Sequence, residues 1–141
     1  MAFKVVTKSF EMGSRGEDDM IDITKEVREA VDSGKLSSGI ATVFVVGSTA
    51  AVTTIEFEPG LAKDFPKALD RVVPKGVAYE HDKRWHDGNG HSHVKASLVG
   101  PSLTVPVVGG DLALGEWQQL VVAEFDTRPR TRKIIVQLIG E

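Results

Sequence analysis

The stretch SLTVPVVGGDLALGEWQQLVVAEFDTRPRTRKIIVQLIG, residues 102–140, decides the fold class. It contains three apolar runs of strand length, at 102–108, 117–125 and 132–140, separated by loops rich in glycine, proline and polar residues. No helical pattern separates these runs, so they predict consecutive strands without the crossover helices that a parallel sheet requires. This part of the chain therefore favours antiparallel pairing.

The first hundred residues add both strands and helices. Residues 2–10 predict an opening strand, and 40–46 and 50–57 predict two strands that are paired neighbours in a sheet. Apolar residues at helical spacing predict helices over 22–34 and 61–73. Helices and strands thus alternate irregularly along the chain.

Residues 90–99 fit a strand or a helix, and the helix is favoured because Asn89 can cap it and Gly100 with Pro101 can end it. The resulting order of elements does not alternate as βαβ units must. We therefore expect one α+β domain over residues 1–141, with a mostly antiparallel, β-sandwich-like core and two or three helices.

Composition excludes several classes of function. The 141 residues include 17 basic and 20 acidic side chains, so no global basic field attracts nucleic acid or a membrane. There is no cysteine, which excludes disulfides, a thiolate zinc site and a cysteine nucleophile. No apolar leader or span of about 20 apolar residues is present, and a cytoplasmic protein is expected.

All four histidines lie within thirteen residues, in the segment YEHDKRWHDGNGHSH at 79–93. Imidazole with carboxylate side chains suits Zn, Mn, Fe or Ni, whereas carboxylates alone suit Mg. The cluster predicts a shared metal or acid/base site, and a solvated, histidine-rich loop is the alternative. The clustered histidines are His81, His86, His91 and His93.

The geometry of this cluster depends on the undecided element at 90–99. In a strand, His91 and His93 face the same side and can chelate as a pair. In a helix they point about 200° apart, at about 100° per residue. The helix would instead offer backbone N–H groups to an anion such as phosphate or diphosphate, beside His93 and Lys95.

Three other patterns have a functional and a structural interpretation. Ser48 and Thr49 lie at the junction of two strands and can bind phosphate or simply form a turn. Glu56 and Glu58 share one face of a strand and are most simply solvent-facing edge charges, with a metal site or protonation of a ring nitrogen as the alternative. The basic run at 128–133 is most simply a solvated hairpin, with anion binding as the alternative.

Three segments resemble the YjbQ-like family, the secondary thiamine-phosphate synthase family: GSTAAVTTIE at 47–56, HDKRWHDGNGHSHVKASLVGPSLTVPVVGGDLALGEWQ at 81–118, and EFDTRPRTRKIIVQLIG at 124–140. The resemblance implies a compact α+β domain that assembles as a homotrimer, with the histidine loop in a cleft near subunit contacts. It also implies a transferase that joins a hydroxymethylpyrimidine diphosphate to a thiazole phosphate and releases diphosphate. A divalent metal, Mg or Zn, and a phosphorylated small-molecule substrate are expected, with no nucleic-acid or membrane partner.

The resemblance also implies roles for individual residues. The expected catalytic residues are His81, Asp87 and His93. The expected substrate-binding residues are Ser48, Thr49, Asn89, Lys95 and Ser97, and the expected metal ligands are His81, His91 and His93. The chain departs from the family pattern at Gly47, where HTTAAV has histidine, and at Glu116, where GTWQ has threonine.

Two other functions fit the same residues. One is a non-catalytic trimeric protein that binds a metal or a phosphorylated metabolite without turnover. The other is a metal-dependent hydrolase of a phosphoester, which needs an activated water but no second substrate.

Overall fold

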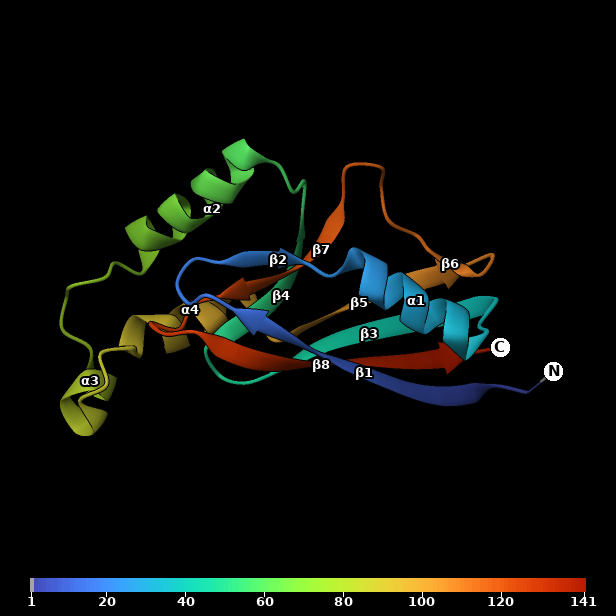
Figure 1. Cartoon of the computed structure of the whole chain (residues 1–141), viewed down its shortest axis with the longest axis horizontal. Coiled ribbons are helices and arrows are strands. Elements are labelled where there is room, and N and C mark those ends of the chain that lie inside the picture. The colour runs from blue at the N-terminus through green and yellow to red at the C-terminus, as the bar shows by residue number, and fades with distance from the viewer. Residues whose placement is uncertain (1) are drawn as a thin grey trace.

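Two antiparallel sheets form the centre of the computed structural model, which describes residues 2–141 (Figure 1). Sheet A has the strand order β1-β8-β3-β5-β6, with bounds Lys4–Ser14, Arg130–Gly140, Ser38–Val46, Ser102–Val108 and Asp111–Leu112. Sheet B has the order β2-β7-β4, with bounds Met20–Asp22, Gln119–Glu124 and Ala50–Ile55. The helices are α1 (Thr24–Gly34), α2 (Pro59–Val72), α3 (Glu80–Trp85) and α4 (Gly90–Val99).

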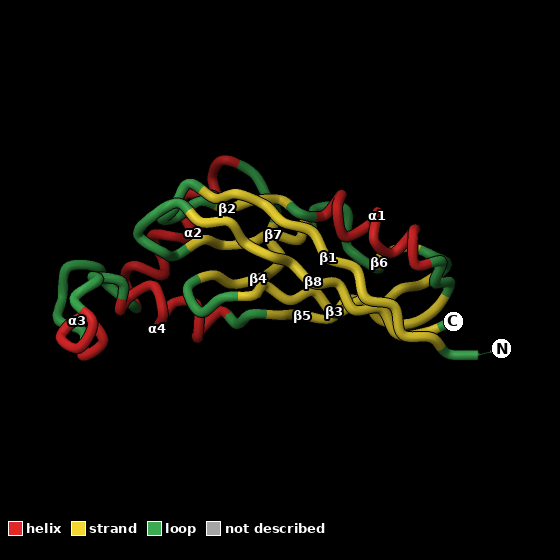
Figure 2. The backbone as a smooth tube through the Cα atoms, turned by 60° about the horizontal axis from the view of Figure 1, so that its bottom comes forward, coloured by secondary structure: helices red, strands yellow, loops and turns green. Residues whose placement is uncertain are grey.

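The main core lies between the two sheets and α1. Strict alternation along β3 buries Ala41, Val43 and Val45 against β4, β7 and α1 and leaves the intervening side chains on the outer face. Val27 and Val31 from the apolar stripe of α1 join this core. Figure 2 shows the resulting layers of strands edge-on, with α1 at one end.

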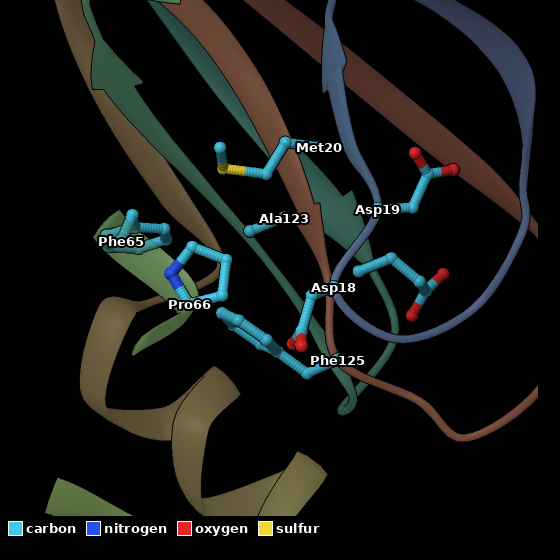
Figure 3. A pocket seen from close by; sticks show the side chains of 8 residues that line it. Asp18, Asp19, Met20, Phe65, Pro66, Ala123 and Phe125 are labelled. Carbon is cyan, nitrogen blue, oxygen red and sulfur yellow. The ribbon is translucent and has the colours of Figure 1, made fainter. Parts of the chain in front are cut away.

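Two helices cover the other face of sheet B. Ala51 and Ala123 of this face pack in a second apolar cluster that includes Ala96 of α4, with Phe65 and Leu69 of α2 against it. Figure 3 shows Phe65 and Pro66 of α2 opposite Met20 and Ala123 in a narrow crevice. This crevice has no room for a water molecule, so it is a packing seam between helix and sheet.

The expected α+β class with a mostly antiparallel core is confirmed, and residues 90–99 are a helix, as favoured. The short helix α3 lies inside the histidine-rich stretch 79–93, for which no helix was predicted. β1 runs four residues further than expected, because it pairs with β8 along its whole length to Ser14. No helix within residues 2–141 is long and apolar enough to cross a bilayer.

The expected pairing of strands 40–46 and 50–57 is wrong. β3 pairs with β5 and β8 in sheet A, whereas β4 pairs with β7 in sheet B. The intervening residues 47–49 therefore pass from one sheet to the other, instead of forming a hairpin turn. This passage places the segment beside α4, at the edge of the sandwich.

Gly39 and Gly140 face each other across β3 and β8 at the opposite end of sheet A. A Cβ atom on either residue would collide with the backbone of the neighbouring strand. Glycine is therefore required here by close backbone approach.

Candidate functional site

Helix α4 carries the histidine cluster and divides it between two faces. Its first N–H, that of Gly90, donates to Asp82 Oδ1 at 2.8 Å, and its backbone continues to Val99. His91 is buried, with Nε2 2.8 Å from Glu17 Oε1. His93 turns away from it toward α3, where its ring centroid lies 4.3 Å from that of His81. The helix therefore brings His81 and His93 together and excludes His91.

His93 borders a cavity of about 160 Å³ at the edge of the sandwich. Segments that are distant in the sequence meet there: the passage between β3 and β4, one face of α4, and the start of β5. Ser48 of the passage is exposed, and Ser97 Oγ donates to the His93 carbonyl at 2.9 Å. The lining residues are Gly47, Ser48, Ala50, His93, Ala96, Ser97 and Pro101.

Behind the two imidazoles lies a polar network. His81 Nε2 is 3.0 Å from the side-chain amide of Asn89 and 3.3 Å from Asp87 Oδ1. The Asn89 amide, which is buried, also lies 3.3 Å from Asp126 Oδ1. Asn89 thus connects His81 to the buried carboxylate of Asp126, and the expected grouping of His81, Asp87, Asn89 and His93 is present in the structure.

The pKa of His93 is lowered from its ordinary value. Burial is the largest cause, and the nearby charge of His81 adds to it. Asp126, Asp87 and a backbone hydrogen bond with Ser48 act in the opposite direction but do not outweigh these effects. His93 is therefore neutral at pH 7 and available to accept a proton.

Asp126 is a fully buried carboxylate that remains ionised. Burial opposes its charge, but Arg130, the Thr127 N–H and Thr49 Oγ1 donate to it and lower its pKa to about 2. Thr49 is itself buried and bonded on both sides, so it supports Asp126 and does not face the cavity as a substrate-binding residue. Ser48 alone of the expected pair lines the cavity.

A second buried ion pair lies beneath the passage between the sheets. Arg132 Nε donates to Glu124 Oε1 at 2.8 Å, and Arg132 Nη2 donates to Thr49 Oγ1 at 2.7 Å. Arg132 is only 5% exposed, so the interpretation of 128–133 as a solvated hairpin is wrong at this residue. Sequence reasoning missed Glu124 and Asp126; the signal was an acidic residue within the apolar run LVVAEF.

Lys95 does not reach the cavity, contrary to its expected role in substrate binding. It is 1% exposed and its Nζ donates to Asp70 Oδ1 of α2 at 2.5 Å. His91 lies one turn earlier on α4 and bonds Glu17, which also contacts Lys75 at 3.0 Å. These residues join α4 to α2 and to the loop before β2, so they anchor the helix.

The expected metal ligands His81, His91 and His93 do not form one site, because α4 directs His91 to the opposite side. Among the side chains of residues 2–141, no group of three histidines or carboxylates has the arrangement of a metal centre. His81 and His93 alone supply fewer protein ligands than a zinc site uses. The described side chains of one chain therefore do not complete the expected zinc site.

Glu58, one of the two acidic residues considered for a metal site, has a structural role. Glu58 caps α2, accepting from Gly60 N–H at 2.7 Å and Leu61 N–H at 2.5 Å. The two tryptophans of the chain, Trp85 and Trp117, are 62% and 67% exposed, so neither belongs to the core. Neither tryptophan lines the cavity beside His93.

The profile of a family described as "UPF0047 protein YjbQ-like" matches residues 8–141. This chain belongs to the UPF0047 YjbQ-like family. It is 40% identical over 121 residues to a UPF0047 protein of Archaeoglobus fulgidus, covering 86% of this chain and 91% of the relative. It is also 36% identical over 135 residues to the UPF0047 protein YugU of Bacillus subtilis, covering 94% and 98%.

Solved structures of the family share the fold. A YbjQ-like protein of unknown function from Sulfolobus solfataricus aligns with a TM-score of 0.94 at 29% identity, covering 99% of this chain and all of that one. An uncharacterised YjbQ/UPF0047 protein from Clostridium acetobutylicum aligns with a TM-score of 0.84 at 37% identity, covering 93% and 98%. The match thus extends over nearly the whole chain.

These comparisons overturn the expected thiamine-phosphate synthase activity. The UPF0047 relatives have family names that state no reaction, and the matching structures are of proteins of unknown or uncharacterised function. Membership in the UPF0047 family therefore gives this chain its fold and not a synthase function.

Proposed function

We propose that this UPF0047 chain is an enzyme that acts on a small phosphorylated metabolite in the cavity beside α4, with His93 moving the proton. One observation carries the proposal: a half-buried histidine with a lowered pKa borders a cavity of about 160 Å³ and contacts a second imidazole. A histidine that is neutral near pH 7 and faces a cavity is suited to general-base catalysis.

The polar network defines a role for each neighbour. His93 accepts a proton from the substrate or from a water in the cavity. The carboxylates of Asp87 and Asp126 raise the pKa of His93 and so stabilise the imidazolium that results. Asn89 and Asp87 hold His81 against His93, and Ser48 faces the substrate.

The test is turnover by the full chain and by His93→Gln, using a panel of phosphorylated small metabolites followed by ³¹P NMR. The proposal expects turnover of at least one compound and a loss of about 10²- to 10⁴-fold in the variant, the range typical of a lost general base. His86→Asn is the matched control, because His86 is exposed and asparagine tolerates its left-handed backbone at φ 58°. Equal turnover by His93→Gln and wild type would refute the assignment.

A second candidate is binding without turnover, favoured by the small size of the cavity. Inorganic phosphate would then perturb the NMR signals of His93 and Ser48, and His93→Gln would weaken this binding, but no compound in the panel would change chemically. The two candidates predict the same binding and differ only in the ³¹P product signals.

We also propose that the chain assembles as a homotrimer through the outer face of sheet A. Three rows of outward-facing residues cross four strands of this sheet, and none of them is charged. The rows are Val5, Ile139, Ile40 and Pro106; Thr7, Gln137, Thr42 and Thr104; and Ser9, Ile135, Phe44 and Ser102. Depletion of charge is a mark of the centre of an interface, whereas a solvated sheet face is normally polar and charged.

A further inference from the structure

Arg132 has one guanidinium nitrogen that its own fold does not use. Its Nε donates to Glu124 at 2.8 Å, and its Nη2 donates to Thr49 at 2.7 Å. Nη1 donates to no other group of residues 2–141. Among these residues, Ser92 Oγ is the single fully enclosed side-chain polar atom without a partner, so Nη1 keeps some contact with solvent. The guanidinium is thus held rigidly with a free donor.

Gly47 lies directly over this free donor. A Cβ atom at position 47 would lie 2.5 Å from Arg132 Nη1, which is inside van der Waals contact, and the backbone φ of +145° also disfavours a side chain. Gly47 is at the same time part of the cavity wall, together with Ser48 and His93. Gly47 therefore has no side chain that could cover Nη1 next to the cavity wall.

We infer that Gly47 and Arg132 determine the specificity of the cavity for a phosphate group, with Arg132 Nη1 donating to a phosphate oxygen that lies against the 47–48 segment. This inference rests on the proposed function, since it concerns the substrate of the same cavity. Arginine is a favoured donor to phosphate, and its N–H bonds to an anion are among the stronger hydrogen bonds in proteins.

The packing explains why this donor is effective. Glu124 and Thr49 hold the guanidinium plane before any ligand arrives, so little side-chain freedom is lost on binding. Glu124 also balances the charge of Arg132, so the site offers a directed hydrogen bond and not a diffuse positive field. Such a site selects a small oxyanion of defined geometry.

The inference is tested by titrating the ¹⁵N-labelled full chain with inorganic phosphate. The side-chain signals of Arg132 and His93 are followed by NMR, with Arg130→Lys used to distinguish the signal of Arg132 from that of Arg130. Saturable shifts of both Arg132 and His93 are expected. Shifts at His93 without any at Arg132 would overturn this inference and leave the proposed function standing, whereas shifts at neither residue would count against the proposed function itself.

Substitution at position 47 provides a second measurement. Gly47→Ala is expected to weaken phosphate binding at least tenfold, because the added methyl group covers Nη1. Gly76→Ala is the control: it places alanine at a positive φ of 78° with no atom within 4 Å of the added carbon. Equal affinity in folded Gly47→Ala and in wild type would also overturn the inference. If Gly47→Ala does not fold, the wild-type Arg132 shift alone decides it.

Discussion

At the scale of single residues, the charge of Asp126 makes a pH-dependent contribution to stability. Its pKa of about 2 lies below the ordinary value of 3.8, so its contribution is complete above pH 4 and is lost as the pH falls toward 2. At about 1.4 kcal/mol per pKa unit this contribution amounts to about 2 kcal/mol. Asp126→Asn is expected to lower the free energy of unfolding at pH 7 by at least this amount.

Urea denaturation at pH 7, 4 and 2 measures the effect. The wild type should lose more stability between pH 4 and pH 2 than Asp126→Asn does, because the variant has no carboxylate to protonate there. Asp111→Asn, which removes an exposed carboxylate, should leave the difference unchanged. Parallel pH profiles of wild type and Asp126→Asn would show that Asp126 is not the responsible group.

A second prediction at this scale concerns the contact between His81 and His93. Burial lowers the pKa of His93 most, and the charge of His81 lowers it further. His81→Asn should therefore raise the pKa of His93 toward 6.5 without restoring it fully, because burial remains. Titration of the His93 ring signal by NMR tests this, with His86→Asn as the comparison. An unchanged or lowered His93 pKa in His81→Asn would contradict the charge effect.

At the scale of elements, the two partners of the ion pair between α2 and α4 should differ in what their removal costs in stability. Lys95 is 1% exposed whereas the Asp70 side chain is 40% exposed, so only the lysine is cut off from water. Asp70→Ala leaves a buried ammonium group without its partner and should cost about 3 kcal/mol. Lys95→Met removes the buried charge and fills its volume, leaving a solvated Asp70, and should cost less than about 1.5 kcal/mol.

Chemical denaturation of both variants distinguishes this from a surface salt bridge. A surface pair would lose the same small amount, below about 1 kcal/mol, from either side. A larger loss from Lys95→Met than from Asp70→Ala would show that packing around the lysine, and not its charge, determines the stability of this contact.

The elements also show how far sequence reasoning reaches. Helix α4 was predictable because Asn89 and Gly100 stand at its ends. The Asn89 side chain makes no capping hydrogen bond, however, since it contacts His81 and Asp126 instead. The separation of β3 and β4 into two sheets was not predictable, since both are apolar strands of similar length and their partners lie more than fifty residues away. Arg132 appeared solvated for the same reason: its partner Glu124 lies on the other sheet.

At the scale of the whole molecule, the candidate site combines contacts that are local in the sequence with contacts that only folding creates. The grouping of His81, Asn89 and His93 is local in sequence, so the cluster was visible before the structure. The cavity is not local, because the 47–48 segment meets α4 only through the packing of β4 under that helix. The exclusion of His91 likewise follows from helical geometry and from Glu17, which lies 74 residues earlier.

The three uncharged rows on the outer face of sheet A lead to the last prediction. Phe44 lies in one of these rows and is 40% exposed in the single chain. Phe44→Glu would place a charge at the proposed interface, where it would be desolvated without a partner. Light scattering should give three times the 15.2 kDa chain mass for the wild type and one chain mass for the variant. Val72→Glu, on the exposed side of α2, should remain trimeric, and a monomeric wild type would rule out the proposed assembly.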